Sequence, residues 1–312
     1  MNEQTELRAI DYSIVVPVYN SATTLADLFV RTRNAFVEMG KSFEVVFVED
    51  CSVDGSWKAI CDLRDQYPSD VVAVKLARNF GQHNATLCGF HHARGRFVVT
   101  IDDDLQVLPE DIGKLIEEQE RSGADLVYGY FAEKQHGIVQ NLGSWAIQKA
   151  CEITFGSKGK GSSFRLIAGW LVQKVKSHQQ SFVFIDGLLH WYTQYISRTL
   201  VRHEARRDGK SGYTLFKLIG LAAHMFFNFT TLPLRWVIYL GILSSTVSFA
   251  FGVVFFIRAF FYAVPAGWSS LAVAIFFVGG IILLVLGIIS EYISRIFSLT
   301  NERPQFSVKE VR

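Results

Sequence analysis

The sequence lacks the features that mark several large classes of protein. Its formal net charge is only +2 over 312 residues, so it carries no basic surface for nucleic acid. The segment from Met1 to Ser13 is polar and has no apolar core of a signal peptide, so we expect the first domain in the cytoplasm. The cysteines have no C-x-x-C spacing, which favours reduced thiols over disulfides or a zinc site; they are Cys51, Cys61, Cys88 and Cys151.

Two common nucleotide-binding motifs are also missing. No G-x-G-x-x-G follows the first apolar run, which disfavours a dinucleotide cofactor. Gly156 and Gly161 have the spacing of a P-loop, but Ser162 stands where that motif needs lysine. A nucleotide, if bound, must therefore be held in another way.

The hydrophobic residues, half of the total, are unevenly distributed. Trp236 to Ile257 and Leu271 to Ser290 contain no charged residue. At about 1.5 Å per residue, each run can cross a hydrocarbon core of about 30 Å as a helix. A pair of buried core helices is the less favoured alternative. The distribution of arginine and lysine predicts that both termini face the cytoplasm. The link between the two runs contains only Arg258, whereas five cations flank the pair of runs: Arg235, Arg295, Arg303, Lys309 and Arg312.

These observations predict four segments in a multi-pass protein of the inner (cytoplasmic) membrane. The first, 1–212, has the composition of a cytoplasmic α/β domain. Residues 213–231 have a broad apolar face and suit an amphipathic helix in the membrane interface. Residues 232–293 form the two-span domain, and 294–312 are expected to be a cytoplasmic C-terminal tail.

The first domain alternates apolar runs with segments of helical periodicity, which predicts a mostly parallel, doubly wound sheet. The expected strands are 13–20, 43–48, 71–76, 97–101 and 127–130, and the expected helices are 21–39, 57–66, 84–93 and 143–155. Carboxyl ends of parallel strands share one rim, so the polar residues after these runs should line one crevice. They are Tyr19, Asn20, Glu49, Asp50, Arg78, Asn79 and Asp102 to Asp104.

Three adjacent acids, Asp102, Asp103 and Asp104, follow the fourth apolar run. Alternate residues of an extended chain point the same way, so Asp102 and Asp104 can converge. Like charges so close together repel unless a cation neutralises them, and a hard ion such as Mg²⁺ or Mn²⁺ fits oxygen ligands. A solvated acidic turn is an equal alternative on the acids alone.

Two loops carry positive charge. Residues 156–163 combine glycines with Lys158 and Lys160, which is equally compatible with a phosphate cradle and with a plain connector. Residues 201–214 contain Arg206 and three other cations just before the membrane section. That position favours a clamp over anionic phosphates rather than a solvated loop.

Together these motifs resemble the membrane-bound glycosyltransferases of family 2 that load a sugar onto a polyprenyl phosphate. The resemblance covers essentially the whole chain. The matching stretches are Val16 to Asn20, Glu49-Asp50 through Ser56, Arg78 to His83, Asp102 to Gln106, Phe164 to Leu166, and Arg206 with Gly209, Ser211 and Tyr213.

The resemblance implies a GT-A fold and a role for each matching residue. It implies donor contacts from Pro17, Tyr19, Asn20, Glu49, Asp50, Asp54, Arg78, Gln82, Asp103 and Gln106, and metal binding by Asp102 and Asp104. Acceptor-phosphate contacts would come from Lys158, Lys160, Arg165, Arg206, Ser211 and Tyr213, and the catalytic set would be Asp102, Asp104, Arg165 and Arg206. Residues 156–163 lack the acid found in related synthases, so no catalytic base is assigned.

The expected reaction is an inverting, metal-dependent transfer from a nucleotide sugar, with UDP favoured, to undecaprenyl phosphate. The product would serve envelope glycan, lipopolysaccharide or lipid modification through a downstream flippase and glycosyltransferase. Self-association through the membrane regions is also implied. Two alternatives stay open. The acceptor could be a sugar hydroxyl, with Asp186 or His83 as general base, or the chain could be a non-catalytic nucleotide-sugar scaffold.

Overall fold

The structure is a computed structural model that describes residues 10–130, 162–179, 183–202 and 304–312, with scattered helical residues between 239 and 296. The chain divides into two compact units, Met1–Tyr213 with Pro304–Arg312, and Thr214–Arg303. The expected helices at 143–155 and 213–231 lie outside the described residues, as do most of the first expected span and part of the second. Among the helices that are described, none combines the length and the apolar character needed to cross a membrane.

The first unit is built on a sheet with the strand order β7-β5-β6-β4-β1-β2-β3-β8. Its centre is parallel: β1 pairs with β2 and β4, and β2 pairs with β3. These four strands are mainly apolar and overlap the strands that the sequence predicted. They span Tyr12–Val18 (β1), Phe43–Glu49 (β2), Val71–Leu76 (β3) and Phe97–Thr100 (β4).

The outer strands add antiparallel pairings and make the sheet mixed, although four of its seven described pairings are parallel, as expected. β6 runs antiparallel to both β4 and β5, β7 runs parallel to β5, and β8 runs antiparallel to β3 at the other edge. Their bounds are Leu126–Tyr130 (β5), Arg165–Ala168 (β6), Ile196–Leu200 (β7) and Val308–Val311 (β8). The end of the expected tail, 294–312, therefore belongs to the sheet.

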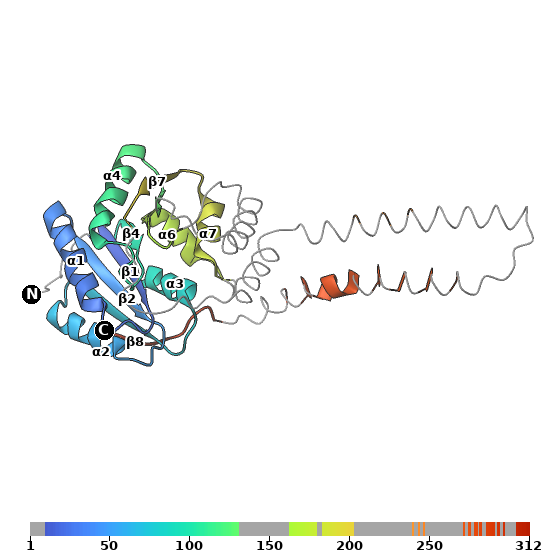
Figure 1. Cartoon of the computed structure of the whole chain (residues 1–312), viewed down its shortest axis with the longest axis horizontal. Coiled ribbons are helices and arrows are strands. Elements are labelled where there is room, and N and C mark those ends of the chain that lie inside the picture. The colour runs from blue at the N-terminus through green and yellow to red at the C-terminus, as the bar shows by residue number, and fades with distance from the viewer. Residues whose placement is uncertain are drawn as a thin grey trace, which may run out of the picture. The chain divides into compact units, whose positions relative to one another are not determined.

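Helices cover both faces of the sheet (Figure 1). One face packs against α1 (Leu25–Met39), α2 (Ser56–Gln66) and α4 (Ile112–Ser122), which follows the short 3₁₀ helix η1 (Pro109–Asp111). The other face packs against α3 (Gln82–His92), α6 (Gly169–Lys176) and α7 (Ile185–Tyr192). Two layers of helices on one sheet are the architecture that alternating strands and helices produce.

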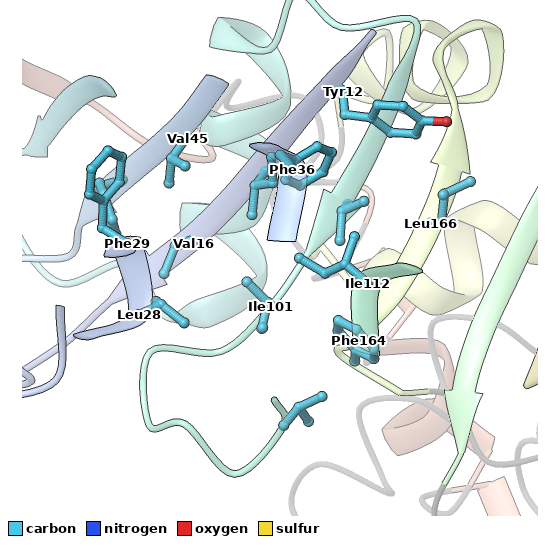
Figure 2. Packing of buried hydrophobic residues seen from close by; sticks show 14 of the residues in the cluster. Tyr12, Val16, Leu28, Phe29, Phe36, Val45, Ile101, Ile112, Phe164 and Leu166 are labelled. Atoms are coloured by element: carbon cyan, nitrogen blue, oxygen red, sulfur yellow. The ribbon is translucent and has the colours of Figure 1, made fainter. Parts of the chain in front are cut away.

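The alternation of side chains along β1 divides the hydrophobic core in two. Val16 faces the first cluster with Leu28 and Phe29 of α1, as Figure 2 shows, whereas Val15 faces the second cluster. α3 approaches β1 so closely that a Cβ at Gly89 would lie 2.3 Å from Val15 Cγ1. This close contact fixes the position of α3, whose first turn reaches the rim described next.

Candidate active site

The order of the parallel strands creates a crevice beside β1. The chain runs outward from β1 through β2 to β3, and then returns to place β4 on the other side of β1. Ligands of open α/β sheets bind at such a switch point, at the carboxyl ends of the strands. In this chain those ends are followed by Tyr19, Asp50 and Asp102.

The backbone after these strands is unusually constrained. The described residues with positive φ other than glycine are Asn20 (55°), Cys51 (58°) and Leu105 (56°), shortly after β1, β2 and β4 respectively. Residues other than glycine rarely adopt this conformation, and it concentrates at ligand-binding sites. The Asn20 amide donates to Ser52 Oγ over 3.0 Å, and Asn20 Oδ1 accepts the Val53 amide over 2.9 Å. Two of the three loops thus hold each other.

Asp103 joins the acid run to the loop after β1. Its Oδ2 accepts the backbone N–H of Tyr19 over 2.9 Å, and its carbonyl oxygen accepts the Thr24 hydroxyl over 2.6 Å. Burial raises the pKa of Asp103, and the neighbouring Asp104 adds to that rise, whereas hydrogen bonds from Ser21 and Tyr19 oppose it. Asp103 lies in a turn and not in an extended chain, and its two hydrogen bonds tie the acid run to the loop after β1.

Asp102 is held from two sides. Gln82 Nε2, at the start of α3, donates to Asp102 Oδ1 over 2.6 Å, and Ser163 Oγ, just before β6, donates to Oδ2 over 2.6 Å. Burial raises the pKa of Asp102 to about 6, and the charges of Asp104 and Asp103 also raise it, while the Ser163 hydrogen bond opposes them. Each oxygen of this carboxylate therefore has a partner from within the protein.

Asp104 and Gln106 form the other end of the acid run. Asp104 Oδ1 accepts the backbone N–H of Gln106 over 3.1 Å, across the left-handed turn at Leu105, and both residues are partly exposed. Within the described residues, no group of three or more histidines, cysteines or acids is arranged to hold a metal ion. The carboxylates nevertheless suit a hard cation that draws its other ligands from phosphates and water. The donor set thus fits Mg²⁺ or Mn²⁺ shared with a bound diphosphate.

The acids that end β2 are turned into the protein. Asp50 accepts the amides of Phe80 and Gly81 over 2.7 and 2.8 Å. Burial raises the pKa of Asp50, although these two amides oppose the rise. Glu49 accepts the Ser52 amide through Oε1, and its Oε2 lies 3.9 Å from Lys75 Nζ without a hydrogen bond in the part of the chain that is described.

The remaining predicted donor residues lie along the same rim or just beneath it. Asp54 accepts the amides of Ala22 and Ser56 over 3.0 Å each. Burial works to raise the pKa of Asp54, but hydrogen bonds from Ser56 and Ala22 lower it overall. The exposed Arg78 guanidinium lies 4.6 Å from the centre of the Phe80 ring, and Pro17 is buried within β1.

Arg165 lies inside the protein and not on the crevice surface. Only 3% of its side chain is exposed, and it forms an ion pair with Asp186 of α7. Its Nε donates to Thr100 Oγ1 over 3.1 Å, and the Tyr128 hydroxyl donates to Asp186 Oδ1 over 2.9 Å. Burial alone would lower the pKa of Arg165, but Asp186 and Tyr128 together outweigh it and raise that pKa. Arg165 and Asp186 thus neutralise each other.

The two expected alternatives for a general base are both in or near this buried group. Asp186 is held by Arg165 and Tyr128. His83, whose ring meets Phe184 edge-on at 5.2 Å, has its pKa lowered to about 4 by burial, with Asp186 opposing and Arg165 reinforcing that shift. Neither arrangement resembles a base with a free path to a substrate hydroxyl.

The basic half of the predicted site lies outside the described residues. This applies to Lys158, Lys160, Arg206, Ser211 and Tyr213. Ser163 and Thr100 were not predicted, although Ser163 donates directly to Asp102 and Thr100 donates to the Ser163 carbonyl oxygen. The one available signal was that Ser163 directly precedes the Phe164-Arg165 pair.

Comparison with known proteins gives matches over most of the chain. Residues 13–173 match the profile of the family described as "Glycosyl transferase family 2". The undecaprenyl-phosphate 4-deoxy-4-formamido-L-arabinose transferase of Pseudomonas aeruginosa is 32% identical over 306 residues, which cover 96% of this chain and 89% of that protein. The Shewanella sediminis protein of the same name is 32% identical over 309 residues, covering 97% and 93%.

Solved structures give a likeness of fold. Glucosyl-3-phosphoglycerate synthase from Mycobacterium tuberculosis in complex with UDP matches with a TM-score of 0.50 and 17% identity, covering 69% of this chain and 77% of that chain. The same enzyme in complex with Mn²⁺, UDP-glucose and phosphoglyceric acid matches with a TM-score of 0.50 and 14% identity, with the same coverages. At these identities the likeness concerns the architecture of the domain alone.

Proposed function

The chain belongs to glycosyl transferase family 2 and is a glycosyltransferase with a GT-A-like mixed sheet, and from this premise we propose that it transfers a sugar from a UDP-linked donor to undecaprenyl phosphate. The observation that carries the proposal is the acid run at the switch point, where Asp102 is fixed from two sides and Asp104 stays partly exposed. This is a site for the diphosphate of a nucleotide sugar.

The acceptor is proposed from the relatives. Proteins named undecaprenyl-phosphate sugar transferases align with 96% or more of this chain, and so with its two apolar runs as well as with its first domain. A polyprenyl tail is costly to remove from a bilayer, at about 0.8 kcal/mol for each CH₂ exposed to water. An enzyme that uses this acceptor therefore needs to work at the membrane surface.

The reaction we propose needs no general base. A phosphate monoester has a second pKa of about 6, so at pH 7 the acceptor is already largely a dianion. One of its oxygens attacks the anomeric carbon, and the bond from that carbon to the nucleoside diphosphate breaks with its electrons leaving on the diphosphate. Attack opposite the leaving group inverts the anomeric configuration. This fits a site in which Asp186 is already neutralised by Arg165.

The residues of the crevice have positioning and electrostatic tasks in this reaction. Asp104 would hold Mg²⁺ or Mn²⁺, and that ion would neutralise charge on the departing diphosphate. Asp102 and Gln106 flank Asp104 and would fix the donor beside it. Lys158, Lys160 and Arg206 are the cations that we propose for the acceptor phosphate, because two dianionic groups repel unless positive charge lies between them.

We further propose that the reaction takes place on the cytoplasmic face of the inner membrane. The uncharged runs 236–257 and 271–290, and the excess of cations outside their link, support two spans with both termini in the cytoplasm. A lipid-linked product made there must be moved across the membrane before it can modify the envelope, so a flippase and a second transferase would follow.

The proposal is tested with purified full-length protein in detergent, undecaprenyl phosphate and Mn²⁺. Release of nucleoside diphosphate is followed with UDP-, GDP- and dTDP-sugars, including 4-deoxy-4-formamido-L-arabinose as the sugar. We expect release that needs both the lipid and the metal, and that Asp104→Asn abolishes. Asp62→Asn is the matched control, because Asp62 is an exposed acid on α2. Release that ignores the lipid would assign a different acceptor.

A further inference from the structure

The crevice is connected to the buried Arg165–Asp186 pair by an unbroken series of hydrogen bonds. Ser163 Oγ donates to Asp102 Oδ2 over 2.6 Å, and the Ser163 carbonyl oxygen accepts the Thr100 hydroxyl. Thr100 Oγ1 in turn accepts Arg165 Nε over 3.1 Å, and Arg165 is paired with Asp186. Thr100 and Arg165 also face each other in the β4–β6 register.

From this geometry we propose that Ser163 is a positioning residue that orients Asp102 for donor binding, and that Thr100 and Arg165 act through Ser163. This inference rests on the proposed function, because it assigns the task of Asp102 to the nucleotide-sugar donor. It gives Arg165 a role behind the crevice in place of contact with the acceptor phosphate.

The burial of the series makes it suited to holding one orientation. Thr100 is 2% exposed and Arg165 is 3% exposed, so neither hydrogen bond competes with bulk water. A hydrogen bond in the low-dielectric interior of a protein is stronger than the same bond at the solvent-exposed surface. Thr100 has a single hydroxyl, which both donates to Ser163 and accepts from Arg165, so displacement of either partner would move the other.

Asp102 needs such support because its surroundings work against it. Asp103 and Asp104 are adjacent carboxylates, and repulsion among three like charges would turn Asp102 away from them. Ser163 on one side and Gln82 on the other prevent that rotation by binding one oxygen each. Ser163 is anchored further to a buried strand, because its carbonyl oxygen accepts the hydroxyl of Thr100 in β4.

The alternative role for Arg165, direct contact with the acceptor phosphate, leads to different kinetics. A phosphate ligand should affect the Michaelis constant of the lipid. A group that acts through Ser163 on Asp102 should affect the binding of metal and nucleoside diphosphate, and leave the Michaelis constant of the lipid unchanged. Thr100→Val separates the two, because it cuts the series while Arg165 stays in place.

The matched control lies at the other end of β1. Ser13 Oγ donates to the buried carboxylate of Glu44 over 2.6 Å, the same length as the bond from Ser163 to Asp102. Ser13→Ala therefore removes a serine–carboxylate hydrogen bond of equal length from the amino end of the sheet. Because Ser13 Oγ also accepts the amides of Arg94 and Gly95, this variant should lose stability without touching the crevice.

The experiment uses full-length protein in detergent and the variants Ser163→Ala, Ser163→Thr, Thr100→Val and Ser13→Ala. Binding of Mn²⁺ with UDP, and with GDP and dTDP in parallel, is measured by calorimetry and by the loss of the electron paramagnetic resonance signal of free Mn²⁺. Ser163→Ala should weaken binding about tenfold or more, as expected for a hydrogen bond to a charged group. Thr100→Val should weaken it by a smaller factor, Ser163→Thr should restore it, and Ser13→Ala should leave it unchanged.

A ligand-free measurement keeps this inference separate from the proposed function. Hydrogen exchange of the peptide covering 101–107 should be faster in Ser163→Ala than in the unchanged protein, and not faster in Ser13→Ala. Faster exchange supports the positioning role even if no nucleoside diphosphate binds, a result that would count against the proposed donor alone. Three results would overturn the inference: unchanged hydrogen exchange in Ser163→Ala, equally weakened nucleotide binding in Ser13→Ala, or a raised Michaelis constant of the lipid in Thr100→Val.

Discussion

The Asp186→Asn substitution should destabilise the first unit strongly, because it leaves Arg165 charged and buried without a counter-charge. The asparagine side chain would keep an oxygen for the Tyr128 hydroxyl, so the change isolates the charge. Removing one partner of a buried ion pair destabilises a protein by about 3–5 kcal/mol. Arg165 is 3% exposed and Asp186 15% exposed. A loss in the upper half of that range therefore requires that no water reaches the Arg165 guanidinium in the variant.

The melting temperature gives the measurement. For a domain of about 150–250 residues, each kcal/mol shifts the melting temperature by about 2–4 °C, so the expected decrease is about 10 °C. Asp125→Asn is the control, because the Asp125 carboxylate accepts hydrogen bonds from the neutral groups Trp170 Nε1 and Thr193 Oγ1. Its expected effect is smaller, about 1.5–3 kcal/mol, as for hydrogen bonds between a neutral donor and a charged acceptor. Equal decreases for the two variants would refute a special role for the buried charge.

Three further changes test the fold. His83 has a pKa of about 4 against an ordinary 6.5, so below pH 6.5 the unfolded chain binds a proton that the folded protein does not, and the free energy of unfolding falls with pH. In His83→Gln this effect is absent, so the stability lost between pH 7 and 5 should be smaller by up to about 2 kcal/mol. An unchanged pH slope in chemical unfolding would contradict this. Gly89→Ala should lower stability by about 1–3 kcal/mol through its overlap with Val15; a melting temperature equal to that of the unchanged protein would exclude such tight packing. Deleting residues 304–312 removes β8 and should speed amide exchange in β3; slow exchange would mean that the edge needs no cover.

The parallel centre of the fold could be predicted because its strands are apolar runs with polar ends. β3 lies at the predicted bounds, Val71–Leu76. β6 was not predicted, because Arg165 opens it and its buried position depends on an ion pair with a residue of α7. β8 contains Lys309 and Glu310, and nothing local marks it as the partner of a strand more than two hundred residues earlier.

The candidate site was predictable to the extent that it follows from strand ends. The sequence placed Tyr19 and the acid run on one rim, and the Tyr19 amide indeed donates to Asp103. Ser163 and Thr100 could not be found this way, because their contacts span 61 and 63 residues and require the unpredicted β6. Arg165 was expected near the acceptor phosphate from the resemblance alone, and only the packing of its side chain reveals Asp186 as its partner.

The most direct test of the proposed function is the dependence of nucleoside diphosphate release on undecaprenyl phosphate. Full-length protein in detergent, Mn²⁺ and the best donor of the panel are assayed with increasing lipid, and with farnesol and a free sugar alcohol as acceptors that carry a hydroxyl in place of the phosphate. We predict release that saturates with the lipid phosphate and stays at background with either hydroxyl acceptor. Release that proceeds with a hydroxyl acceptor, or that is independent of lipid, would contradict transfer to a polyprenyl phosphate.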